Sequence, residues 1–148
     1  MLAALQLTQR VRARAPKVHR VSGRIAIVLA WVSGVTGLFF GLWQPLAGIA
    51  EQVVVGGVGL FLIVAVSLAF RHIRAGRVAA HREWMLRGIA AALAIASVRV
   101  VGFPLYLVLT PRGVDLRVIF ALSLWLGWGL ALAGAEWWIR ATRVRSHV

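Results

Sequence analysis

The chain has 148 residues, of which 61% are hydrophobic and only 14% are charged, and it contains no cysteine. Soluble domains carry about a quarter charged residues, and without cysteine this chain cannot build disulfides or thiolate metal sites. The net charge is +13, but the basic residues lie between long apolar runs and form no soluble basic face, so the sequence does not predict nucleic-acid binding.

Four apolar runs approach or exceed the length of about 20 residues that a helix needs to cross the hydrocarbon core of a membrane. The predicted spans are residues 25–43, 52–70, 85–109 and 116–139. A basic segment, residues 1–22, precedes them, and a basic tail, residues 141–148, follows them. The connection from Arg71 to Trp84 is longer than the other two and strongly charged. We therefore expect residues 23–140 to form one transmembrane domain.

The distribution of basic residues predicts how the chain is oriented. Cytoplasmic segments of membrane proteins carry an excess of Lys and Arg. One side of the membrane receives 14 of the 17 basic residues: Arg10, Arg12, Arg14, Lys17, Arg20, Arg24, Arg71, Arg74, Arg77, Arg82, Arg87, Arg140, Arg143 and Arg145. We predict an all-α, antiparallel, up-and-down four-helix bundle in the inner (cytoplasmic) membrane of the cell. Both termini are then cytoplasmic, and the basic inner face meets anionic lipids.

Small residues recur at four-residue spacing within the spans. In the first span, Ser33, Gly37 and Gly41 form such a stripe, with Gly34 beside it. Small residues let spanning helices approach closely, because lipid supplies no hydrophobic driving force for their association. The pattern predicts close packing between helices and not a ligand site.

Two histidines, His19 and His81, precede the first and third spans at the predicted inner membrane edge. Imidazoles on facing helices can ligate haem iron or a transition metal, so b-type haem is the cofactor that these candidate ligands suggest. The alternative is that both are interfacial histidines, hydrogen-bonded to a neighbouring carboxylate or carbonyl. The spacing alone favours this second interpretation.

Ionisable side chains inside a spanning helix or at its edge are costly, and each is a candidate for a buried polar cluster. Four residues qualify: Arg24, Arg87, Arg99 and Glu136. Glu136 lies about 20 residues into the fourth span, at the depth of Arg24 and Arg87, and we expect it to pair with one of them. Arg99 lies about 18 Å of helix beyond Arg87. It either faces the bundle interior or a water-filled space, where it would attract an anion, or it snorkels toward the outer surface or hydrogen-bonds backbone carbonyls near Gly102 and Pro104.

The charged connection carries the most specific motif in the chain. Residues 74–87 read RAGRVAAHREWMLR, which contains the pattern His-Arg-x-Trp-Met-x-Arg. Further motif residues are His19-Arg20, Gly23-Arg24, Arg99 and Ala135-Glu136-Trp137. In these motifs the chain resembles the predicted membrane proteins grouped as domain of unknown function 2306, over most of residues 17–140. It departs from that family after Trp128, where Gly129 and Leu130 stand at positions that are often polar. The resemblance implies a four-helix membrane protein and supplies no established activity.

No complete catalytic set is present in the sequence. It lacks a glycine-rich phosphate loop, an HExxH motif and a nucleophile elbow, and four Asp and Glu residues in all are too few for a paired-carboxylate hydrolase to be expected. We therefore expect a non-enzymatic membrane module, either a small carrier or an accessory subunit, within a larger complex or a homo-oligomer. The alternative is a b-type haem electron-transfer protein with His19 and His81 as ligands.

Overall fold

The computed structural model describes residues 15–144, apart from the side chains of Ala94, Ile95, Ser97 and Val144. The described chain forms four long α-helices and one 3-10 turn, and no strand occurs within it. The elements are α3 (Pro16–Trp43), α4 (Ile49–Arg74), α5 (Val78–Leu109), η1 (Thr110–Arg112) and α6 (Leu116–Val144). Most of the predicted basic N-terminal segment, and the last residues of the basic tail, lie outside the described residues.

All four helices are long and apolar enough to cross a membrane. Each helix contains one of the predicted spans, so the expected number of spans is confirmed. The helices nevertheless reach further than the predicted spans, because α3 already begins at Pro16 and α6 continues to Val144. Proline suits the first helical position, where its missing N–H would have no partner in the helix.

The connection between α4 and α5 is much shorter than predicted. Only Ala75, Gly76 and Arg77 separate the two helices, although the sequence suggested a loop from Arg71 to Trp84. Gly76 has φ 72°, and the Arg77 N–H donates to the His72 carbonyl at 2.9 Å. A glycine in this left-handed conformation ends a helix and satisfies its last carbonyls. The charged residues on either side continue the helices because arginine, alanine and glutamate are good helix formers.

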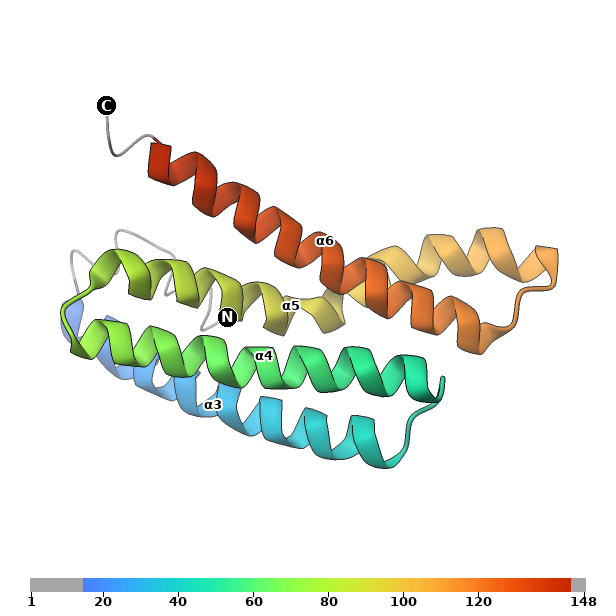
Figure 1. The fold of residues 1–148 in the computed structure, drawn as a ribbon, viewed down its shortest axis with the longest axis horizontal. Coiled ribbons are helices and arrows are strands. Elements are labelled where there is room, and N and C mark those ends of the chain that lie inside the picture. The colour runs from blue at the N-terminus through green and yellow to red at the C-terminus, as the bar shows by residue number, and fades with distance from the viewer. Residues whose placement is uncertain (1–14, 145–148) are drawn as a thin grey trace.

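The four helices form an open row and not a closed bundle. α3 packs against α4, α4 against α5 and α5 against α6, with a smaller contact between α4 and α6. Figure 1 shows α3 and α6 at opposite edges of this row. The compact bundle expected from the sequence is therefore not formed. In a membrane, exposed apolar side chains cost nothing against lipid tails, so no hydrophobic force draws α6 back onto α3.

α5 approaches both of its neighbours through glycines. Nearer the α4–α5 connection, Gly88 lies against α4, where an added Cβ would stand 3.2 Å from Val66. Nearer the α5–α6 connection, Gly102 lies against α6, where an added Cβ would stand 2.9 Å from the Ser123 hydroxyl. α5 bends along its length (Figure 1) and contains Pro104 in its interior. Proline removes one helical hydrogen bond and clashes with the preceding turn, which kinks a helix.

Three glycines lie at the close approach of α3 and α4. A Cβ added to Gly34 would lie 2.7 Å from Ile63, and one added to Gly59 would lie 2.8 Å from Leu38 and 3.3 Å from the Gly34 carbonyl. In the predicted stripe, a Cβ added to Gly41 would overlap Val55 of α4, whereas Gly37 has nothing within 4 Å of such a Cβ. The glycines of α3 that pack against α4 are therefore Gly34 and Gly41, and not Gly37.

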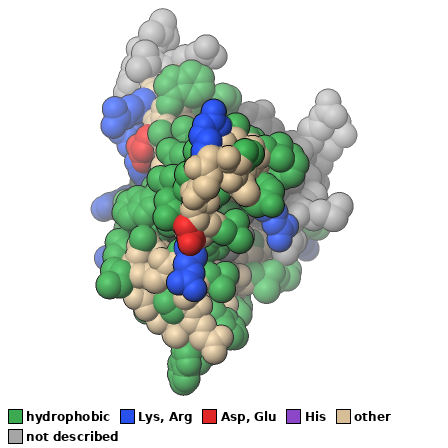
Figure 2. All heavy atoms as spheres, turned by 90° about the vertical axis from the view of Figure 1, so that its right-hand side faces the viewer, with side chains coloured by type: hydrophobic (Ala, Val, Ile, Leu, Met, Phe, Trp, Pro, Cys, Tyr) green, Lys and Arg blue, Asp and Glu red, His purple; other side chains and the backbone are tan. Residues whose placement is uncertain are grey.

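The two ends of the row differ in charge. Figure 2 shows the end that carries the α3–α4 and α5–α6 connections, where hydrophobic and uncharged side chains cover most of the surface. Glu51 is buried there and accepts a hydrogen bond from the Ala47 N–H at 2.7 Å. Asp115 accepts one from the Arg117 N–H, also at 2.7 Å. Most of the basic residues that the structure describes lie toward the opposite end, where α3 begins, α6 ends and the α4–α5 connection lies.

Candidate functional site

Arg87 of α5 and Glu136 of α6 form a two-pronged ion pair. The Arg87 Nε donates to Glu136 Oε1 at 2.5 Å, and Nη2 donates to Oε2 at 3.2 Å. A planar guanidinium matches a carboxylate in this geometry, which lysine cannot reproduce. The Arg87 side chain is only 17% exposed and that of Glu136 is 37% exposed. Of the two partners expected for Glu136, Arg87 and Arg24, the structure pairs it with Arg87.

Glu83, one helical turn before Arg87, extends this pair into a network. Its Oε2 lies 3.8 Å from the Arg87 Nη1. It also accepts two hydrogen bonds from Arg143 on α6, one of them from Nε at 2.5 Å. The Arg87 guanidinium carbon lies 4.8 Å from the centroid of the Trp84 ring. Glu83 is not among the residues predicted from the sequence, although its i,i+4 spacing from Arg87 is a signal for a helical ion pair.

The candidate ligand His81 connects α5 to α4. Its Nδ1 lies 2.8 Å from the Ala69 carbonyl oxygen. Because a carbonyl can only accept, Nδ1 is the donor, and Nε2 is the ring nitrogen that remains for other contacts. His19 is half-buried in the first turn of α3, where its backbone N–H donates to the Ala15 carbonyl at 3.1 Å. The His81 bond is the kind of contact expected of an interfacial histidine.

The structure does not bring the four members of the expected polar cluster together. Arg87 and Glu136 are paired, but Arg24 and Arg99 are both exposed. Arg24 lies on α3, which makes no substantial contact with α6 in the described chain. Arg99 lies in the second half of α5, twelve residues beyond Arg87. The cluster is therefore one ion pair and two separate arginines.

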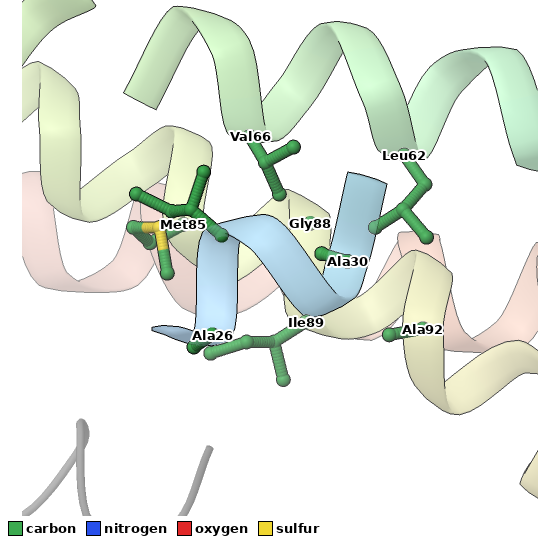
Figure 3. Close-up of a pocket in the computed structure, with 9 residues that line it drawn as sticks. Ala26, Ala30, Leu62, Val66, Met85, Gly88, Ile89 and Ala92 are labelled. Carbon is green, nitrogen blue, oxygen red and sulfur yellow. The ribbon is translucent and has the colours of Figure 1, made fainter. Parts of the chain in front are cut away.

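One small apolar pocket lies between α3, α4 and α5, and its lining includes Met85 and Gly88, which neighbour Trp84 and Arg87 in the chain. Its volume is about 100 Å³. Figure 3 shows side chains from all three helices around it, including Ala26 and Ala30 of α3, Val66 of α4 and Met85 of α5. A haem group is several times larger than this pocket. Among the described residues, no group of three or more His, Asp and Glu is placed to hold a metal ion.

Comparison with protein families gives one match that spans almost the whole chain. The family described as predicted membrane protein (DUF2306) matches residues 1–139. The chain belongs to this family. No curated protein and no solved structure matches it.

In this DUF2306 chain, the loop motif found in the sequence lies in a helix and not in a loop. The residues His81 to Arg87 form the second and third turns of α5. Within this segment His81 binds α4, while Glu83 and Arg87 bind α6. Trp84 lies beside the Arg87 guanidinium. The motif segment therefore joins three neighbouring helices near the α4–α5 connection.

The departure from the family that the sequence shows after Trp128 lies in the middle of α6. Trp128 of α6 packs against α4, with its ring 6.5 Å from that of Phe61 and its edge near Gly57. Its indole Nε1 is buried and has no hydrogen-bond partner within the described part of the chain. The next two residues, Gly129 and Leu130, carry no polar side chain.

Proposed function

We propose that this DUF2306 protein is a non-enzymatic membrane module that acts as an accessory subunit of a larger membrane complex. One observation carries the proposal: the side chains of the family motif bind neighbouring helices of the same chain. The motif residues His81 and Arg87 have partners on α4 and α6 respectively. Glu83, at the variable position between them, also has a partner on α6. Side chains used in this way serve to hold helices in place, and no substrate or proton path is needed to explain them.

The open row supports an accessory subunit over a small carrier. A carrier needs a passage enclosed by its helices near the middle of the membrane. Here α3 and α6 do not close onto each other, and the pocket between α3, α4 and α5 is small and apolar. The outward faces of α3 and α6 are covered with large apolar side chains, such as Val28 and Leu130. Such faces can pack against helices of another protein as well as against lipid.

We place the protein in the cytoplasmic membrane, with successive helices crossing in alternate directions and both termini on the cytoplasmic side. The support is the excess of basic residues at the end that carries the α4–α5 connection. Exposed described cations at this end include Lys17, Arg20, Arg71, Arg74, Arg77, Arg82 and Arg140. These cations suit contact with anionic lipid headgroups.

The absence of cysteine makes this orientation simple to test. A single cysteine at Leu46→Cys, in the α3–α4 connection, should react with a membrane-impermeant maleimide added outside right-side-out vesicles. The matched Ala75→Cys, in the α4–α5 connection, should react only after the vesicles are opened. Both positions are exposed, so access to reagent depends on the membrane alone. The reverse labelling pattern would contradict the proposed orientation.

The accessory role predicts an assembly larger than one chain. The tagged protein, extracted from its native membrane in a mild detergent, should migrate in native electrophoresis above the size of the 16.1 kDa chain with its detergent. Chemical cross-linking before extraction should preserve the same species. A strictly solitary chain under both conditions would overturn the proposal.

The haem alternative is motivated by His81, whose Nδ1–H bond to a carbonyl is also the contact that orients metal-ligating histidines. The pocket near His81 is, however, far smaller than haem. The described contacts therefore support the accessory role better. A Soret band in the purified chain that disappears on His81→Ala would favour the haem alternative over the accessory role.

A further inference from the structure

Arg99 is a charged side chain in the middle of a spanning helix. It lies ten residues before the end of α5 at Leu109, which is about 15 Å of helix. It lies twelve residues after Arg87, which is about 18 Å. An extended arginine side chain is shorter than either distance. Arg99 therefore cannot bring its guanidinium fully out of the hydrocarbon region on either side.

No described residue of the chain compensates this charge. Arg99 makes no hydrogen bond, ion pair or aromatic contact with the described residues, whereas Arg87 is bound by two carboxylates. Its side chain is exposed on the surface of α5. Two other residues on the same face of the helix are also exposed, namely Ala96 and Phe103. A charged group in this position normally pairs with another group or lines a water-filled space.

A second copy of the chain offers no suitable carboxylate. The sequence contains only four acidic residues: Glu51, Glu83, Asp115 and Glu136. Glu83 and Glu136 are bound by arginines near the α4–α5 connection, far from Arg99 along the helices. Glu51 and Asp115 lie at the outer helix starts, where each accepts a backbone hydrogen bond. A homodimer would therefore leave Arg99 uncompensated at its depth.

We infer that Arg99 binds an aspartate or glutamate within a spanning helix of a different membrane protein. This inference rests on the proposed accessory function and names the chemistry of the partner. The partner helix packs on the face of α5 that presents Ala96, Arg99 and Phe103. The small side chain of Ala96 lets the two helices approach, and the opposite charges select this partner and its depth.

Photo-cross-linking in the native membrane tests the inference at this face. A photoreactive benzoylphenylalanine replaces Phe103, which is 66% exposed, and adducts are identified by mass spectrometry. We expect the adduct to contain one other membrane protein, which has an acidic residue inside a predicted span. Arg99→Leu should reduce this adduct by about tenfold, the factor that corresponds to one strong polar interaction between spanning helices. Arg99→Lys, which keeps the charge, should retain most of it, and Arg99→Glu combined with arginine at the partner's acidic position should restore it.

Two controls distinguish the loss of this contact from a loss of folding. Arg24→Leu removes another exposed arginine and should leave the adduct unchanged. Arg99→Leu should not lower the melting temperature of the purified chain, because Arg99 has no partner within the described chain. An adduct that Arg99→Leu does not reduce, an adduct only with lipid, or an adduct only with a second copy would each overturn the inference. If the native complex keeps its mass in these cases, the proposed accessory function stands. A solitary chain would overturn both.

Discussion

Arg87→Ala should lower the free energy of unfolding by about 3 kcal/mol, the cost typical of removing one partner from a largely buried ion pair. The substitution leaves Glu136 without its bidentate partner and Glu83 without its neighbouring cation. It also removes the guanidinium from the Trp84 ring. Unfolding by sodium dodecyl sulfate in mixed micelles, followed by tryptophan fluorescence, measures the change. The effect should be concentrated on the contact between α5 and α6.

Two further variants show whether the charge pair itself is responsible. Arg71→Ala removes an exposed arginine at the same end of the molecule and should change stability by less than about 0.5 kcal/mol. The double variant Arg87→Met, Glu136→Leu should recover most of the loss, because replacing a buried pair by apolar side chains is far less costly than breaking it. A double variant as unstable as Arg87→Ala would contradict a pairwise origin. It would point to packing of the arginine stem instead.

Gly59→Leu should separate α3 from α4 and cost about 3 kcal/mol, at the upper end of typical overpacking effects. The new Cβ alone would meet Leu38 at 2.8 Å and the Gly34 carbonyl at 3.3 Å. The backbone at Gly34 cannot rotate away as a flexible side chain can, so α3 itself has to move. Because α4 is the main packing partner of α3, this displacement should free the whole first helix. The same unfolding titration measures the loss.

Gly37→Leu is the matched control for this substitution. Gly37 lies one turn after Gly34 on α3, and nothing lies within 4 Å of a Cβ built there. Leucine has a higher helix propensity than glycine, so this variant should be neutral or more stable by up to about 1 kcal/mol. Equal destabilisation by both variants would contradict the contact between Gly34 and Gly59 as the crossing point of the helices.

The sequence by itself determined the features that depend on composition and on the depth of each residue within the membrane. Long apolar runs predict spanning helices whatever their neighbours, because backbone groups in lipid must be hydrogen-bonded within the helix. The family followed from the motif around His81 and Trp84. Equal depth narrowed the partner of Glu136 to Arg24 or Arg87, since few charged groups share a level inside a membrane, and the structure selected Arg87.

Only the tertiary structure decided which face of each helix is covered. It showed that the helices form an open row, that Gly34 and not Gly37 meets α4, and that Arg99 points outward while Arg87 points to α6. It also placed Glu83 in the network and turned most of the predicted loop into helix. The physical reason is that a uniformly apolar helix has no polar side to mark the outside. Its orientation depends on close contacts between residues that are far apart in the chain.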